Sequence, residues 1–165
     1  MKTPKNKISP FVATNKAYIL PEDTLSTVND AGVAYNTISA NQKLTKIETI
    51  RKGLPFDSIE VISHRINRPV KAVLSLLDMP QTTYNKKKNE NSRLDHRNSE
   101  LIVLISELID YGTMVFNNEI EKFQRWLKKP NSSLGGLEPE SLLDTVTGIQ
   151  EVKYALHRLE FGNFA

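Results

Sequence analysis

The chain has 165 residues, of which 39% are hydrophobic and 25% are charged, with a formal net charge of +3 and a pI near 9.0. These values are ordinary for a soluble globular protein, and this length can bury a core as one domain or as two small ones. The sequence contains no cysteine, which excludes disulfide scaffolds, thiolate zinc sites and cysteine nucleophiles.

The N-terminal residues 1–43 are polar and interrupted by prolines, and only Leu25–Tyr35 could form a short helix. We expect a partly flexible arm that is ordered mainly where something packs on it. Pro10, Asn15 and Lys16 interrupt the start of the chain before a signal sequence could form. Because no run of about eighteen apolar residues follows, we expect a cytoplasmic protein that makes no membrane contact.

The next part of the chain, residues 44–92, shows helical spacing of its apolar residues, with breaks that divide it into short helices. Gly53 and Pro55 end the first helix, and Pro69 is well placed as the first residue of a later one, which ends at Met79-Pro80. The apolar residues that define these helices are Ile47, Ile50 and Leu54, then Ile59, Ile62 and Ile66, then Val70, Val73, Leu74 and Leu77.

A short polar helix is expected at residues 81–89, which read QTTYNKKKN. Two helices joined by a tight turn form a helix-turn-helix, whose second helix enters the major groove of DNA. Glutamine and asparagine can pair with adenine, threonine can contact the thymine methyl group, and lysine can reach phosphates or guanine. An ordinary helical hairpin is the alternative. The candidate DNA-binding residues are Gln81, Thr82, Thr83, Asn85, Lys86, Lys87 and Lys88.

The stretch Ser99–Phe116 is the most apolar in the chain, and its apolar residues lie on more than one helical face. We expect it to be the central helix, because such a helix is buried on more than one face. An amphipathic helix over Ile120–Leu127 follows, and then two helices over Pro139–Val146 and Ile149–Leu159, with Gly148 between them. Apolar and polar residues never alternate for long, so the predicted fold class is all-α.

The sequence offers little that could carry catalysis. Its three histidines lie far apart and lack a metal-ligand spacing such as HExxH. Gly135 and Gly136 are not followed by the lysine of a phosphate loop, and a tight turn with positive φ explains them. Glu138 and Glu140 could pair as acid and base, but acidic residues in the first turn of a helix usually complement its dipole. We predict no catalytic residue, no metal and no cofactor.

Residues 126–162 contain the run WLxxPNxxLGGxxPxxLLxTxxGxxxVxxxLxRxExG. This run resembles the toxin-binding domain of the Xre/MbcA/ParS antitoxins, and a looser resemblance continues upstream through the helix-turn-helix region. The resemblance implies an all-α fold in which an Xre-like helix-turn-helix region, residues 44–92, is joined to a helical toxin-binding domain, residues 93–165.

The same resemblance implies an antitoxin of a type II toxin-antitoxin system that is not an enzyme. Its partner would be a RES-domain toxin that consumes NAD or transfers ADP-ribose from it, and the antitoxin would mask the NAD-binding cleft. The complex would bind the promoter DNA of its own operon and repress it. Helix-turn-helix proteins usually bind as dimers, so we expect a homodimer within a larger hetero-complex.

The predicted toxin-binding residues lie in the Gly-Gly loop, in the last helix and in the tail after it. They are Asn131, Leu134, Gly135, Gly136, Arg158, Gly162, Asn163, Phe164 and Ala165. Trp126 is expected to be core that holds the loop. Three alternatives stay open: the tail could be a frayed terminus, Arg158 could pair with Glu151 or Glu160, and the protein could be a stand-alone helix-turn-helix regulator whose C-terminal domain dimerises.

Overall fold

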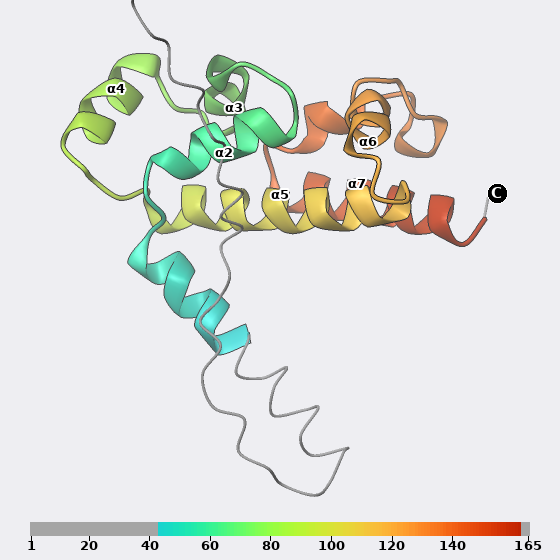
Figure 1. The fold of residues 1–165 in the computed structure, drawn as a ribbon, viewed down its shortest axis with the longest axis horizontal. Coiled ribbons are helices and arrows are strands. Elements are labelled where there is room, and N and C mark those ends of the chain that lie inside the picture. Colours follow the sequence, from blue (N-terminus) through green and yellow to red (C-terminus); the bar gives the residue numbers. More distant parts are fainter. Residues whose placement is uncertain (1–42, 163–165) are drawn as a thin grey trace, which may run out of the picture.

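The computed structural model of the chain describes residues 43–162, which fold into helices joined by short loops (Figure 1). The helix considered at Leu25–Tyr35 lies outside these residues. A first helix covers residues 43–52. The elements after it are α2 (Asp57–Arg65), α3 (Val70–Leu76), α4 (Gln81–Asn89), α5 (His96–Val115), α6 (Ile120–Leu127), the 3₁₀ turns η1 (Ser132–Leu134) and η2 (Pro139–Leu142), and α7 (Val146–Glu160).

The all-α prediction is confirmed. Between residues 43 and 162 the only β-type pairings are isolated bridges from Pro55 to Arg93 and from Asn131 to Leu137. Over the same range, no helix has both the length and the apolar character needed to cross a membrane.

Helix α5 is the central helix, as its apolar residues predicted. It packs against α2, α6 and α7, and α7 runs beside it (Figure 1). It begins at His96 rather than at Ser99, because the Asp95 carboxylate caps it by accepting a hydrogen bond from the Asn98 N–H at 2.8 Å. Its fully buried or nearly buried apolar residues are Leu101, Ile102, Ile105, Leu108 and Ile109.

Helix α2 packs on α5, α3 packs on α2, and α4 packs on α3 at the end of the molecule where α5 begins (Figure 1). The turn after α2 uses a positive φ at Asn67, and Pro69 stands just before α3 as its N-cap instead of being its first residue. Helix α4 has the predicted bounds. The helix-turn-helix arrangement therefore consists of α3, the turn at Asp78 to Pro80, and α4.

The predicted apolar face of the first helix becomes more buried along its length. Ile47 is 42% exposed, Ile50 is half-buried, and Leu54 just beyond the helix is buried. Gly53 does end the helix, with a positive φ of 82°. Helical spacing thus identified the helix but not that its first part packs little on the rest of the protein.

The prediction that Gly148 separates two helices is wrong. Pro139–Leu142 forms a short 3₁₀ turn, and α7 begins at Val146 with Gly148 in its first turn. Thr145 caps α7, because its Oγ1 accepts a hydrogen bond from the Gly148 N–H at 3.1 Å. A Cβ at position 148 would lie 2.0 Å from the Leu142 carbonyl oxygen, so glycine here allows close packing.

A second glycine lets α6 approach α5. A Cβ on Gly112 would lie 2.2 Å from Cε2 of Phe123, which is fully buried in α6. Phe123 also stacks on Trp126 with ring centroids 6.1 Å apart and contacts Phe116 at the end of α5. The aromatic side chains of α6 therefore pack on a flat part of α5 that only glycine provides.

We expect Gly112→Ala to destabilise the protein. Alanine favours a helix over glycine by up to about 1 kcal/mol, but overpacking a core typically costs about 1–3 kcal/mol, so the steric effect should prevail. The free energy of unfolding, measured with urea, should fall by about 1–2 kcal/mol. Met114→Ala, at a position of the same helix that is 54% exposed, is the matched control. A Gly112→Ala variant as stable as the wild type would contradict the close packing described above.

Candidate functional site

The loop between α6 and η2, residues 131–137, is closed by its own hydrogen bonds. The Asn131 side-chain oxygen accepts from the Ser133 N–H at 2.9 Å and from the Ser133 hydroxyl at 2.8 Å. The Asn131 N–H donates to the Leu137 carbonyl oxygen at 3.0 Å, and the Gly136 N–H donates to the Asn131 carbonyl oxygen at 2.9 Å. The loop therefore has a fixed shape in the free protein.

The two glycines form the exposed tip of this loop. Their φ angles are 68° at Gly135 and 82° at Gly136, so the predicted positive φ is confirmed. A Cβ at either position would meet nothing within 4 Å, so glycine is favoured here by the backbone conformation and not by crowding. Leu134 beside them is buried and anchors the loop to the core. The tip thus offers bare backbone to a partner.

Arg158 of α7 lies against the loop. Its Nη2 donates a hydrogen bond to the Ser133 carbonyl oxygen at 3.3 Å. Its Nε is buried and has no hydrogen-bond partner among residues 43–162. Glu160, considered as a partner of Arg158, instead accepts a hydrogen bond from the Tyr111 hydroxyl of α5. Arg158 therefore supports the loop, and its Nε is enclosed by the protein.

The remaining residues of this predicted site are only partly described. Gly162 follows α7 with a φ of 67° and is exposed. It lies just beyond the C-cap of α7, Phe161. Asn163, Phe164 and Ala165 lie outside the described residues. Trp126 is half-buried and packs against the core, as predicted, through its ring contacts with Phe116 and Phe123.

Helix α4 presents an almost wholly polar surface. Tyr84 alone is buried, and its ring lies 6.1 Å from that of Phe56. The side chains of Gln81 and Asn85 are hydrogen-bonded to each other, because Gln81 Nε2 donates to Asn85 Oδ1 at 3.1 Å. The exposed candidates for DNA contact are Gln81, Thr82, Thr83, Asn85, Lys86 and Lys87.

Lys88 differs from its two neighbours, because it is bound to acidic side chains of α2. It forms an ion pair with Glu60 and a longer one, 3.4 Å, with Asp57. The Tyr84 hydroxyl also donates to Glu60, at 2.9 Å. The Lys88 ammonium, followed by the Tyr84 hydroxyl, holds the pKa of Glu60 below its usual value, and the hydrogen bond to Glu60 raises the pKa of Lys88. Lys88 thus fastens α4 to α2.

The turn between α2 and α3 is tied to the C-terminal part of the molecule. Arg68 Nε donates to both carboxylate oxygens of Glu140 in η2 at 2.8 Å. From α6 and its C-cap, Gln124 donates to the Arg65 carbonyl oxygen at 2.8 Å and Lys128 donates to that of Asn67 at 3.0 Å. Glu140 is therefore engaged in a structural contact, which accounts for it without the acid–base role considered from the sequence.

These features define a class of protein: a helix-turn-helix unit with an exposed polar second helix, joined to a helical domain that displays a preformed loop. The comparisons with known proteins agree with this class. The antitoxin Xre-like helix-turn-helix domain matches residues 46–107, and the antitoxin Xre/MbcA/ParS C-terminal toxin-binding domain matches residues 112–162. The chain belongs to the Xre/MbcA/ParS antitoxin family, and it is an antitoxin with both a helix-turn-helix domain and a toxin-binding domain.

Three curated relatives resemble the chain over most of its length. Antitoxin Xre of Yersinia enterocolitica is 27% identical over 128 residues, covering 78% of this chain and 86% of that protein. The Prs ADP-ribosylating antitoxin of a Sphingobium species is 26% identical over 140 residues, covering 80% and 88%. Antitoxin Xre of Photorhabdus laumondii is 25% identical over 113 residues, covering 68% and 76%. All three are named as antitoxins, which favours that function over a stand-alone regulator.

Sequence reasoning missed two features of these surfaces. The ion pair of Lys88 with Glu60 joins residues far apart in the chain, and no local pattern signals it. The second is a set of exposed aromatic residues on α7, Tyr154, His157 and Phe161. Their spacing of three, four and seven is that of one helix face, so this set was visible in the sequence.

We expect Glu60→Gln to weaken the attachment of α4 in a pH-dependent way. A carboxyl group whose pKa is lowered by folding stabilises the protein above its unfolded pKa, and this contribution disappears as the pH falls through the folded pKa. The variant should therefore lose about 0.5–1 kcal/mol of unfolding free energy at pH 7, the range of exposed ion pairs.

The loss should shrink as the pH falls from the usual glutamate pKa of about 4.3 through the lower pKa of Glu60 in the folded protein, below which the wild-type carboxyl is also neutral. Urea titrations at pH 7 and at pH about 3 would measure both values. Glu100→Gln, at an exposed position of α5 with no ion pair within the described range, is the control. A loss of equal size at both pH values would contradict the ion-pair account.

Proposed function

We propose that this antitoxin inhibits a RES-domain toxin by covering the toxin's NAD-binding cleft, and that it represses the promoter of its own operon. The toxin consumes NAD or transfers ADP-ribose from it. Two copies of the chain form a homodimer within a larger complex with the toxin, because helix-turn-helix proteins usually bind DNA as dimers. The complex acts in the cytoplasm, where NAD and promoter DNA are both present.

One observation carries the toxin half of this proposal: a rigid loop tip, a half-buried arginine that supports it and the start of the tail all lie toward one end of α7. The tip is Gly135 and Gly136, the arginine is Arg158, and the tail begins at Gly162. A preformed loop loses little conformational entropy on binding. Arg158 can bind a carboxylate of the toxin with its remaining donors.

The link to NAD rests on two supports. The domain that carries the loop belongs to the toxin-binding family. One relative is named as an ADP-ribosylating antitoxin, and ADP-ribosylation draws its ADP-ribose from NAD. We propose that the loop, Arg158 and the residues after α7 press against the entrance of the cleft, so that NAD cannot enter while the complex persists.

The DNA half of the proposal rests on the exposure of α4. Gln81, Thr82, Thr83 and Asn85 would contact base edges, and Lys86 and Lys87 would contact phosphates. Lys88 contributes through its ion pair with Glu60, which orients α4, and adds less charge to the DNA surface than its neighbours because the carboxylate partly neutralises it.

Inhibition of the toxin tests the first half. Together with a RES-domain toxin, the wild-type chain should suppress NAD consumption and co-purify with the toxin. Arg158→Ala should raise the dissociation constant about 10- to 100-fold, and deletion of residues 162–165 should also weaken inhibition. Arg97→Ala, an exposed arginine near the start of α5, is the control. A toxin that stays fully active beside the wild-type chain would overturn the proposal.

Binding to the DNA upstream of its own gene, measured by fluorescence anisotropy across salt concentrations, tests the second half. Replacing Lys86 and Lys87 by alanine should weaken binding and reduce the slope of log K against log salt by about 1 for each phosphate that is no longer bound. Lys129→Ala, an exposed lysine after α6, should leave both unchanged. If the wild-type protein shows no salt-dependent binding to this DNA, the repressor role is wrong.

A further inference from the structure

The toxin-binding domain has an exposed aromatic face on α7 that lies outside the loop and the tail proposed above to bind the toxin. Tyr154 is 51% exposed and Phe161 is 60% exposed, and both lie at the C-terminal part of α7, Phe161 as its C-cap. They are seven residues apart, so they stand on the same side of the helix. The buried residues Val152 and Leu156 lie on the opposite side. Within residues 43–162, this side of α7 is left uncovered.

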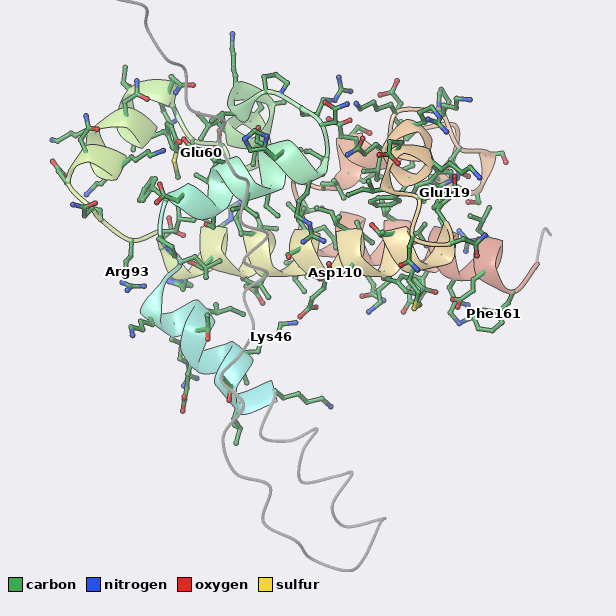
Figure 2. All side chains as sticks on the ribbon, viewed as in Figure 1. Lys46, Glu60, Arg93, Asp110, Glu119 and Phe161 are labelled. Atoms are coloured by element: carbon green, nitrogen blue, oxygen red, sulfur yellow. The ribbon has the colours of Figure 1, made fainter. Side chains whose placement is uncertain are left out.

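This face contains a recess of about 350 Å³ between α7 and the end of α5. Its walls come from Tyr111 of α5 and from exposed side chains between Gln150 and Phe161. The His157 and Phe161 rings are in contact, with centroids 4.5 Å apart, and Figure 2 shows Phe161 at the C-terminal end of α7. A recess of this size can admit one large apolar side chain.

Tyr111 makes one wall of the recess rigid. Its hydroxyl donates to the Glu160 carboxylate. Burial, together with this hydrogen bond, raises the pKa of Tyr111 to about 12. Glu160 keeps its negative charge in this bond, at the edge of the recess. Lys153 and Arg158 are the cations that flank the face.

The aromatic face is continuous with the loop. Tyr154 and Arg158 are four residues apart on α7 and are therefore neighbours on the helix surface. Arg158 in turn reaches the Ser133 carbonyl oxygen in the loop. Arg158 thus lies between the loop and Tyr154, so that one partner could contact both.

We propose that this face is the anchor of the toxin interface: the recess takes an apolar side chain of the toxin, and carboxylates beside that side chain face Lys153 and Arg158. This inference rests on the proposed function. Aromatic residues and arginine dominate the binding energy of protein interfaces, whereas bare glycine backbone contributes contacts without a side chain. The face also lies in the stretch that belongs to the toxin-binding family. The toxin is therefore the occupant, in preference to a second copy of the chain.

The test compares the dissociation constant of the RES-domain toxin for full-length variants, measured by titration calorimetry. Tyr154→Ala and Phe161→Ala should each raise it at least tenfold, and Tyr154→Phe should preserve it because the recess needs the ring. Val61→Ala in α2, at a position that is also 51% exposed, is the matched control and should leave it unchanged. Thermal melts confirm that each variant is folded.

The outcomes separate the two proposals. If the wild-type chain does not bind the toxin, the proposed function fails. If the wild-type chain binds and the double variant Tyr154→Ala with Phe161→Ala binds within twofold of it, only the aromatic anchor is wrong. A double variant that changes the oligomeric state of the free antitoxin would assign the face to a second copy, and this too would overturn the inference.

Discussion

Helix α5 has apolar side chains on more than one side, and they leave water together only when α2, α6 and α7 pack around the helix at the same time. Every candidate surface is carried by an element that this packing positions. Gly112 sets how closely α6 approaches, and α6 leads into the loop at Asn131. Near the N-terminal end of α5, the buried Ser99 hydroxyl accepts a hydrogen bond from the Leu54 N–H at 3.0 Å. This bond satisfies a buried backbone donor just before the chain enters α2.

Hydrogen bonds then fix the orientation of the two halves, which apolar packing alone does not. Backbone carbonyls at the end of a helix need partners. The carbonyl of Arg65, the last residue of α2, accepts a hydrogen bond from Gln124, and that of Asn67 accepts one from Lys128. Lys128 also places a positive charge near the negative end of the α2 dipole. The Arg68 pair with Glu140 extends these ties to the turn before α7. The helix-turn-helix and the toxin-binding domain are thus joined by directional contacts at one turn.

The sequence-based predictions were accurate for features that depend on neighbouring residues, and less accurate for features that depend on residues far apart in the chain. Periodicity located α5 and α6 because it reflects local burial, the break at Met79-Pro80 placed the start of the polar helix α4, and a fixed run of residues identified the family. Gly148 was misplaced because its reason, close approach to the Leu142 carbonyl oxygen, exists only in three dimensions. The Asp95 cap was a local signal that went unused. The surfaces themselves were only partly predictable: the positive φ of the Gly-Gly loop followed from glycine, whereas the roles of Lys88 and Tyr111 depend on Glu60 and Glu160, 28 and 49 residues away.

Helix α5 also crosses the boundary between the two family matches, since it runs from His96 to Val115 while one match ends at residue 107 and the other starts at residue 112. The two domains are therefore joined by one continuous, largely buried helix and not by a flexible linker. Unfolding of α5 would expose the apolar core of both domains at once. The two halves should therefore unfold as a single cooperative unit. If one half were degraded, the other half should not remain folded. The surface proposed to bind the toxin and the helix proposed to contact DNA would therefore be lost in the same event.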